Sequence, residues 1–479
     1  MIRSRALPLT STLRVATSPM VLKSSQHGSR DRNDSPVAAS GAKRHGIVRM
    51  FAINATWSLV GVGASRAVVL AASVLLARML GPVEFGRLGA ASGTAALFTA
   101  LGALGLGLAA TKHVAQYRRS DRAKAAAVVV TSMRGALVCA VVLCLVGVAG
   151  GRAVARGAFA DESLAVTVQL AVVWAACGSV LPVQTSILAG LERFRAIAGL
   201  NIVRGVSTAV FQVIGAHWYG SNGAVAGAAL AEIASAFAGY CVVSRRCEEE
   251  GLRTGPGAFA GVIPVLLRFG LASWIGGLAT TPALWLCRVW VVRGPGGLHD
   301  MGVFEAANKY ALSLLLLPSA AGVVQLPLLS RLAEGDGAAF RRVRRLHLSI
   351  IAGTTVLPAA GMAVCAGSLM GLAGPEYGSG GNVLAVLAAA SIASAFNTSF
   401  GQSLISKGHV RVRLVADVGL ALIMVAAGWM VIPSHGALGF AIAQLLAYGS
   451  VVCLLGLLEA RAQSAAQVTP PGEMSRVTQ

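Results

Sequence analysis

The segment AAAVVVTSMRGALVCAVVLCLVGVAGG, residues 125–151, holds 27 residues and a single charge, Arg134. About 20 apolar helical residues cross the roughly 30 Å of hydrocarbon in a bilayer, so the segment predicts a transmembrane helix. Eleven further apolar blocks make twelve in all, with centres near residues 63, 97, 137, 176, 206, 232, 276, 315, 357, 392, 422 and 447. Alternating strand patterns of about ten residues are absent, which argues against a barrel. The chain is predicted to be an all-α integral membrane protein.

Composition supports the same class. Of the 479 residues, 55% are hydrophobic and 12% charged, and the mean hydropathy is +0.71. A soluble domain carries about a quarter charged residues, so the excess apolar surface must face lipid. The net charge of +21 would suggest nucleic acid in a soluble protein, but the basic residues lie in connections between apolar blocks and no nucleic-acid motif occurs. The expected partner is the bilayer, and nucleic acid is excluded.

The basic residues of the connections predict an orientation. With the N-terminus inside, the connections that follow even-numbered helices lie on the inner side and hold eighteen Lys and Arg residues. The connections that follow odd-numbered helices lie on the outer side and hold six, namely Arg78, Arg87, Arg152, Arg156, Arg288 and Arg293. Inner loops of membrane proteins carry the excess of Lys and Arg. The sequence therefore predicts a multi-pass protein of the cytoplasmic membrane with both termini in the cytoplasm.

The blocks divide into two sets of six. We expect an N-terminal six-helix lobe over 49–247, a cytoplasmic linker over 248–258, a C-terminal six-helix lobe over 259–461 and a cytoplasmic tail over 462–479. Residues 1–48 are basic and rich in Ser, with no apolar segment of a signal peptide. They are interpreted as a disordered cytoplasmic tail, although a start of translation at Met50 or Met20, or a transit peptide, would also fit.

An internal duplication relates the two lobes. Three pairs of segments are separated by a little over 210 residues, namely Gly223–Ala224 with Gly436–Ala437, ILAG at 187–190 with ISKG at 405–408, and Glu84–Phe85 with Phe304–Glu305. Because six helices is an even number, both lobes keep the same orientation. This arrangement is typical of a two-lobed transporter whose site lies between the repeats.

Five short segments at helix junctions carry a resemblance to a known family. They are ARMLGPVEFG at 77–86, GLERF at 190–194, GVFEAANK at 302–309, GPEY at 374–377, and IP at 432–433 with GALG at 436–439. In order and position they resemble the polysaccharide flippases of the multidrug/oligosaccharidyl-lipid/polysaccharide exporter superfamily, over about residues 50–460. The resemblance implies two six-helix bundles around a central cavity that opens alternately to each side. It also implies a substrate in which a saccharide is joined through pyrophosphate to a polyprenyl lipid, and it suggests polysaccharide assembly proteins as partners.

Charged residues inside the apolar blocks are the candidate site. A charge at the bilayer centre is costly unless it faces a cavity or a partner. Arginine offers a planar fork of donors that suits phosphate oxygens. We expect a cationic cavity for the pyrophosphate, formed by Arg66 and Arg268 first, one from each lobe, then Arg288 and Lys309, with Arg78 and Arg87 at its outer mouth.

Structural interpretations of the same charges stay open. Arg134, Arg204 and Arg268 lie close enough to predicted helix ends to reach the headgroups. Glu305 and Lys309 stand four residues apart and would neutralise each other on one helix. Glu232 could couple transport to H⁺ or Na⁺, as could Glu305, or it could make a structural hydrogen bond.

Other functional classes find little support. No P-loop, zinc-protease motif or dinucleotide loop occurs, and the eight cysteines lie mostly in apolar blocks without metal-ligand spacing. We therefore expect no catalytic residues, no metal and no cofactor. The alternatives are a cation-coupled multidrug-type exporter of the same superfamily and a membrane-embedded polysaccharide polymerase or ligase, although the outer loops are too short for the catalytic groups of the latter.

Overall fold

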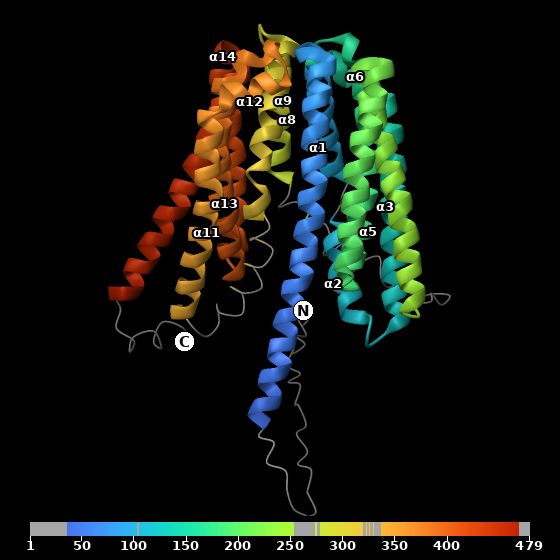
Figure 1. The fold of residues 1–479 in the computed structure, drawn as a ribbon, viewed down its shortest axis with the longest axis vertical. Helices are drawn as coiled ribbons and strands as arrows, with labels where there is room; N and C mark the ends of the chain where they lie inside the picture. The colour runs from blue at the N-terminus through green and yellow to red at the C-terminus, as the bar shows by residue number, and fades with distance from the viewer. Residues whose placement is uncertain are drawn as a thin grey trace, which may run out of the picture. The chain divides into compact units, whose positions relative to one another are not determined.

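The computed structural model describes residues 36–102, 105–252, 278–319 and 337–468, together with 274, 322, 325 and 329. For residues 36–60, 337–338 and 459–468 only the backbone is described. Contacts divide the chain into residues 1–51 and residues 52–479, and the description below concerns the second unit. Every regular element in the described ranges is a helix (Figure 1).

The N-terminal half, residues 52–252, ends with α6. Its helices are α1 (Pro36–Gly102), α2 (Leu106–Tyr117), α3 (Arg122–Val154), a π-helical turn (Ala155–Phe159), a 3₁₀ turn (Glu162–Leu164), α4 (Ala165–Gly178), α5 (Val180–Gly190) and α6 (Phe194–Glu249).

The C-terminal half, described from residue 278 onwards, repeats this plan. Its helices are α8 (Thr280–Arg293), α9 (Gly297–Ser313), α11 (Gly337–Val364), α12 (Ala366–Ala373), a 3₁₀ turn (Pro375–Gly380), α13 (Gly381–Ser406) and α14 (Val410–Val468).

Seven described helices are long and apolar enough to cross a membrane. Three of them turn sharply and therefore count for two predicted blocks each, because the backbone is not helical at Gly81 in α1, at Tyr219 and Gly220 in α6 and at Gly436 in α14. The blocks predicted around residues 276 and 315 are described only in part, as α8 and α9. The predicted fold class, an all-α membrane protein of two related six-helix lobes, is confirmed. The predicted domain limits stay a prediction, with α1 beginning at Pro36 and α14 ending at Val468.

Backbone turns with positive φ prove the repeat. Gly297 lies 216 positions after Gly81, Gly436 lies 216 after Gly220, and all four have φ between 51° and 70°. Glu192 and Gly408 form a third pair with the same separation, and Ala160 and Gly374 a fourth with a separation of 214. Positive φ is uncommon outside glycine, so its recurrence at separations of 214 to 216 residues marks equivalent corners.

This spacing corrects the register taken from the sequence. At a separation of 216 the partner of Glu84 is Asp300, and Glu305 corresponds to Gly89. The three pairs of segments matched by sequence are therefore displaced by two to four positions. The physical reason is that helices rich in Gly, Ala and Leu resemble themselves at every turn, whereas a corner can occupy only one position.

The equivalent acids occupy equivalent places. Glu84 follows the corner at Gly81–Pro82, and its Oε2 accepts hydrogen bonds from the Ser221 hydroxyl (2.5 Å) and backbone N–H (3.4 Å), where the second arm of α6 begins. A carboxylate stabilises the free N–H groups and positive dipole of a helix N-terminus. In the other half the Asp300 carboxylate lies against Gly436, where the second arm of α14 begins, and leaves no room there for a side chain.

Apolar cores show where the halves meet. The largest cluster combines residues of both halves, from Leu76 to Val225 and from Ala283 to Leu455. Two smaller clusters, around Leu188 and around Ala388, draw on one half each. The two halves therefore share one core and each keeps packing of its own.

Candidate functional site

Two glycines bring the halves together. A Cβ atom on Gly86 would collide with the carbonyl group of Leu298, and one on Gly302 would collide with the carbonyl group of Pro82. Gly302 lies 216 positions after Gly86, and Leu298 lies 216 after Pro82, so the contact is reciprocal. The second arm of α1 and α9 therefore cross at backbone distance, which small residues permit between membrane helices.

Two arginines add a second reciprocal pair beside this crossing. Arg78 of the N-terminal half donates from Nε to the carbonyl oxygen of Leu372, at 2.5 Å. Arg293 of the C-terminal half donates to the carbonyl oxygen of Gly157. The Tyr377 hydroxyl donates in addition to the Ala77 carbonyl oxygen at 3.1 Å. Arg78 thus ties the halves together as a structural clamp while it also lines a cavity of about 820 Å³ with Glu84 and Glu376.

A buried carboxylate lies between the halves next to the crossing. Glu305 is 2% exposed and accepts from Lys309 (2.7 Å) and from the hydroxyl of Ser92 in the other half (3.3 Å). Arg288 lies 3.8 Å from its second oxygen and stands over the ring of Phe440. Two cations thus surround one anion, so the pairing of Glu305 with Lys309 predicted from their spacing is present.

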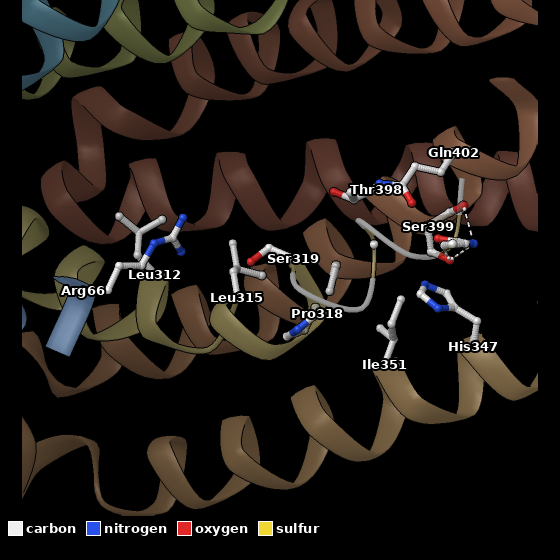
Figure 2. A pocket seen from close by; sticks show the side chains of 13 residues that line it. Arg66, Leu312, Leu315, Pro318, Ser319, His347, Ile351, Thr398, Ser399 and Gln402 are labelled. Atoms are coloured by element: carbon white, nitrogen blue, oxygen red, sulfur yellow. Dashed lines mark hydrogen bonds between the residues drawn. The ribbon is translucent and has the colours of Figure 1, made fainter. Parts of the chain in front are cut away.

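Arg66 lines a separate cavity farther along the helices. The cavity holds about 190 Å³, and apart from Arg66 its described lining comes from the C-terminal half: Leu312, Leu315, Pro318, Ser319, Gly322, Gln325, His347, Ile351, Ala395, Thr398, Ser399 and Gln402. Figure 2 shows Arg66 at one end and His347, Ser399 and Gln402 toward the other. Within the described part of the chain Arg66 makes no hydrogen bond or ion pair.

The structure separates the predicted cationic residues. Arg66 lines the 190 Å³ cavity, whereas Arg288 and Lys309 surround Glu305. Arg87 lies 3.4 Å from Glu84 and donates to the Ser163 hydroxyl. Arg268 lies outside the described residues. No arrangement of the described side chains therefore gathers the predicted set into one site, and their roles in binding stay predictions.

Glu232 and Arg204 form an ion pair within the N-terminal half. The Glu232 carboxylate is 3% exposed, and one of its oxygens accepts from Nε (2.9 Å) and Nη2 (2.5 Å) of Arg204. The two residues lie on the two arms of α6, which the corner at Gly220 folds against each other. The pair gives Glu232 a structural partner that the sequence did not reveal, because Arg204 lies 28 positions away.

The polar residues of the 190 Å³ cavity were missed at the sequence level. His347, Gln325, Ser399 and Gln402 are uncharged and scattered over three segments. They were missed because the candidate residues were chosen from the sequence by their charge. A search for amide and imidazole side chains inside apolar blocks would have found His347, Gln325 and Gln402, since those groups also need partners in a membrane.

Part of the chain matches a known protein family. A family model described as "Polysaccharide biosynthesis protein" matches residues 51–333. No match was found among curated protein sequences.

Several solved structures share the fold. An inward-facing multidrug resistance MATE family transporter of the MOP superfamily has a TM-score of 0.62 at 15% identity, covering 86% of this chain and 96% of its own. A MOP superfamily transporter from Pyrococcus furiosus scores 0.64 at 15% identity, with 87% and 96% covered. The lipid II flippase MurJ, in an inward closed conformation, scores 0.60 at 13% identity, with 83% and 86% covered.

The glycine crossing predicts how the halves respond to a methyl group. We expect Gly86→Ala and Gly302→Ala each to push the halves apart, because the new Cβ meets backbone that cannot rotate away. In a background without the native cysteines, maleimide labelling of Ser92→Cys should then rise several-fold. Gly63→Ala, with no atom within 4 Å of its Cβ, is the matched control on α1. Unchanged labelling in both variants would contradict the crossing.

The Arg204–Glu232 pair predicts a double-mutant effect. Arg204→Met should lower the free energy of unfolding by about 1–3 kcal/mol, because a buried acceptor loses its partner. Adding Glu232→Gln should restore much of that loss, as measured by thermal unfolding in detergent. If Glu232→Gln alone is fully stable yet alters the pH or Na⁺ dependence of transport, the carboxylate acts in ion coupling instead.

Proposed function

Because the chain belongs to the polysaccharide biosynthesis protein family, whose model covers more than half of it, we propose that it is a flippase for a saccharide linked through pyrophosphate to a polyprenyl lipid. It is a multi-pass membrane protein of transporter fold. In this proposal the protein performs no covalent chemistry and has no cofactor. It serves the assembly of a cell-surface polysaccharide, and its partners are the assembly proteins that supply or take up the lipid-linked substrate.

The charge of Arg66 carries this proposal. It lies 15 residues before the corner at Gly81, or about 22 Å along a helix with a rise of 1.5 Å per residue. With the corner placed at the membrane surface, that depth lies within the roughly 30 Å of hydrocarbon, where an unpaired charge costs several kcal/mol unless it faces a cavity or a ligand. Arg66 has no described partner and lines a cavity. A diphosphate would supply the missing anion and accept its fork of donors.

The contacts between the halves support alternating access. Among the described residues, the hydrogen bonds that join them involve N-terminal residues 77–100, which run from the corner at Gly81 along the second arm of α1, and residue 157. Arg66, which lines the 190 Å³ cavity, lies instead on the first arm of α1, 15 residues before that corner. Separation of the halves at the glycine crossing, with closure at the opposite ends, would expose the cavity to the other side of the membrane. Coupling to H⁺ or Na⁺ through Glu305 would require displacement of Lys309 from its carboxylate.

Binding of the lipid-linked sugar tests the function. We expect purified protein to bind a short-chain polyprenyl-pyrophosphate saccharide saturably. Arg66→Ala should weaken binding at least tenfold, which is about 1.4 kcal/mol. Arg66→Lys keeps the charge but loses the planar fork of donors, so its affinity for the lipid should lie between those of wild type and Arg66→Ala. Arg411→Ala, at an exposed position at the start of α14, is the matched control and should bind as wild type.

Two results would overturn the flippase proposal. One is wild-type protein that ignores the lipid but binds small cationic amphiphiles, which favours a multidrug-type exporter. The other is Arg66→Ala binding the lipid as tightly as wild type.

Orientation is a separate part of the proposal, with both termini on the cytoplasmic side of the cytoplasmic membrane. Ser163 and Ser120 are both exposed and lie near opposite ends of α3. We expect an impermeant maleimide added to intact cells to label Ser163→Cys and to reach Ser120→Cys only after permeabilisation. The reverse pattern would contradict the orientation.

A further inference from the structure

The cavity that Arg66 lines has an uncharged polar end. Gln325 donates to the Ser399 hydroxyl at 3.0 Å, which joins α13 to the segment after α9. Beside this pair lie His347 of α11 and Gln402 of α13. Figure 2 shows the four segments that supply Arg66, Ser319, His347 and Ser399 around one space. Side chains from different helices thus converge there.

Two polar atoms at this end have no hydrogen-bond partner among the residues that the structure describes. They are Nε2 of His347, a residue that is 8% exposed, and the buried Oε1 of Gln402. A buried donor or acceptor that has lost water without gaining a partner is unfavourable. Gly322 contributes to this geometry, because a Cβ there would lie 3.0 Å from the Gln402 amide nitrogen and press on it. The fold therefore holds open hydrogen-bonding groups in a space that no described protein group fills.

The chemistry of the lining selects a class of ligand. Among the described lining residues Arg66 is the charged one, and amide, imidazole and hydroxyl groups make up the other polar groups. Leu312, Leu315 and Ile351 add apolar surface. Neutral donors and acceptors beside apolar walls suit a ring with hydroxyl groups on its edge and C–H groups on its faces. The volume of about 190 Å³ is below the roughly 300 Å³ at which pockets for drug-sized ligands begin, so it holds one ring.

We propose that this cavity binds the first sugar ring of the lipid-linked substrate, the one joined to the pyrophosphate, through His347 and Gln402. The inference rests on the proposed function, and the placement follows from Arg66 at the opposite end of the cavity. With the phosphates at Arg66, the attached ring reaches the uncharged end and supplies hydroxyl groups to Nε2 of His347 and Oε1 of Gln402. Later sugars of the chain extend outside the cavity.

Two probes separate recognition of the sugar from recognition of the phosphates. They are a short-chain polyprenyl pyrophosphate carrying one N-acetylhexosamine and the same lipid without the sugar. Each is titrated into full-length protein with wild-type sequence, Gln402→Met or His347→Phe. Both substitutions keep volume and remove a hydrogen-bonding group. Gln116→Met, at an exposed position on α2, is the matched control.

We expect wild type to bind the sugar-bearing lipid at least tenfold more tightly than the bare lipid. Gln402→Met and His347→Phe should reduce that ratio at least fivefold while the affinity for the bare lipid is unchanged, which also shows that the variants are folded. Equal binding of both probes by wild type, or an equal loss for both probes in the variants, would overturn the sugar site and leave the flippase proposal standing. Wild type that binds neither probe would overturn both.

Discussion

The crossing of Gly86 and Gly302 is the constraint on which the rest of the structure depends. Each glycine faces a carbonyl group of the other half, so the second arm of α1 and α9 approach at backbone distance. The reciprocal bonds of Arg78 and Arg293, the shared apolar core and the burial of Glu305 follow from that approach. Because the crossing obeys the internal repeat, each half contributes one glycine and one carbonyl group to it.

Charge is handled in two ways inside this helix bundle. Glu232 is matched by Arg204, and Glu305 by Lys309 and Arg288, so burial is offset by pairing. Arg66 has no such described partner and instead lines a cavity whose other end holds polar atoms without a described hydrogen-bond partner. The buried acids are thus neutralised inside the bundle, whereas the charge of Arg66 is the one that the proposed diphosphate would neutralise.

The sequence predicted much of the fold and part of the site, for physical reasons that differ by residue. Apolar length fixes the helices, and the corner at Gly81–Pro82 is visible because glycine and proline restrict the backbone. The ion pair of Glu305 with Lys309 could be predicted, because the two residues are four positions apart on one helix. Arg204 with Glu232 was not, because it depends on how two arms of α6 fold together. His347 and Gln402 carry no charge that a search for intramembrane ions would detect.

By itself, the sequence determined that this is an all-α membrane protein of two related six-helix halves, since hydropathy and helix length act locally. Only the tertiary structure decided the register of the repeat, which of the arginines clamp or pair, and which one lines the 190 Å³ cavity. Those outcomes depend on contacts between residues up to about 300 positions apart, such as Tyr377 with Ala77. Packing geometry rather than local propensity selects such contacts.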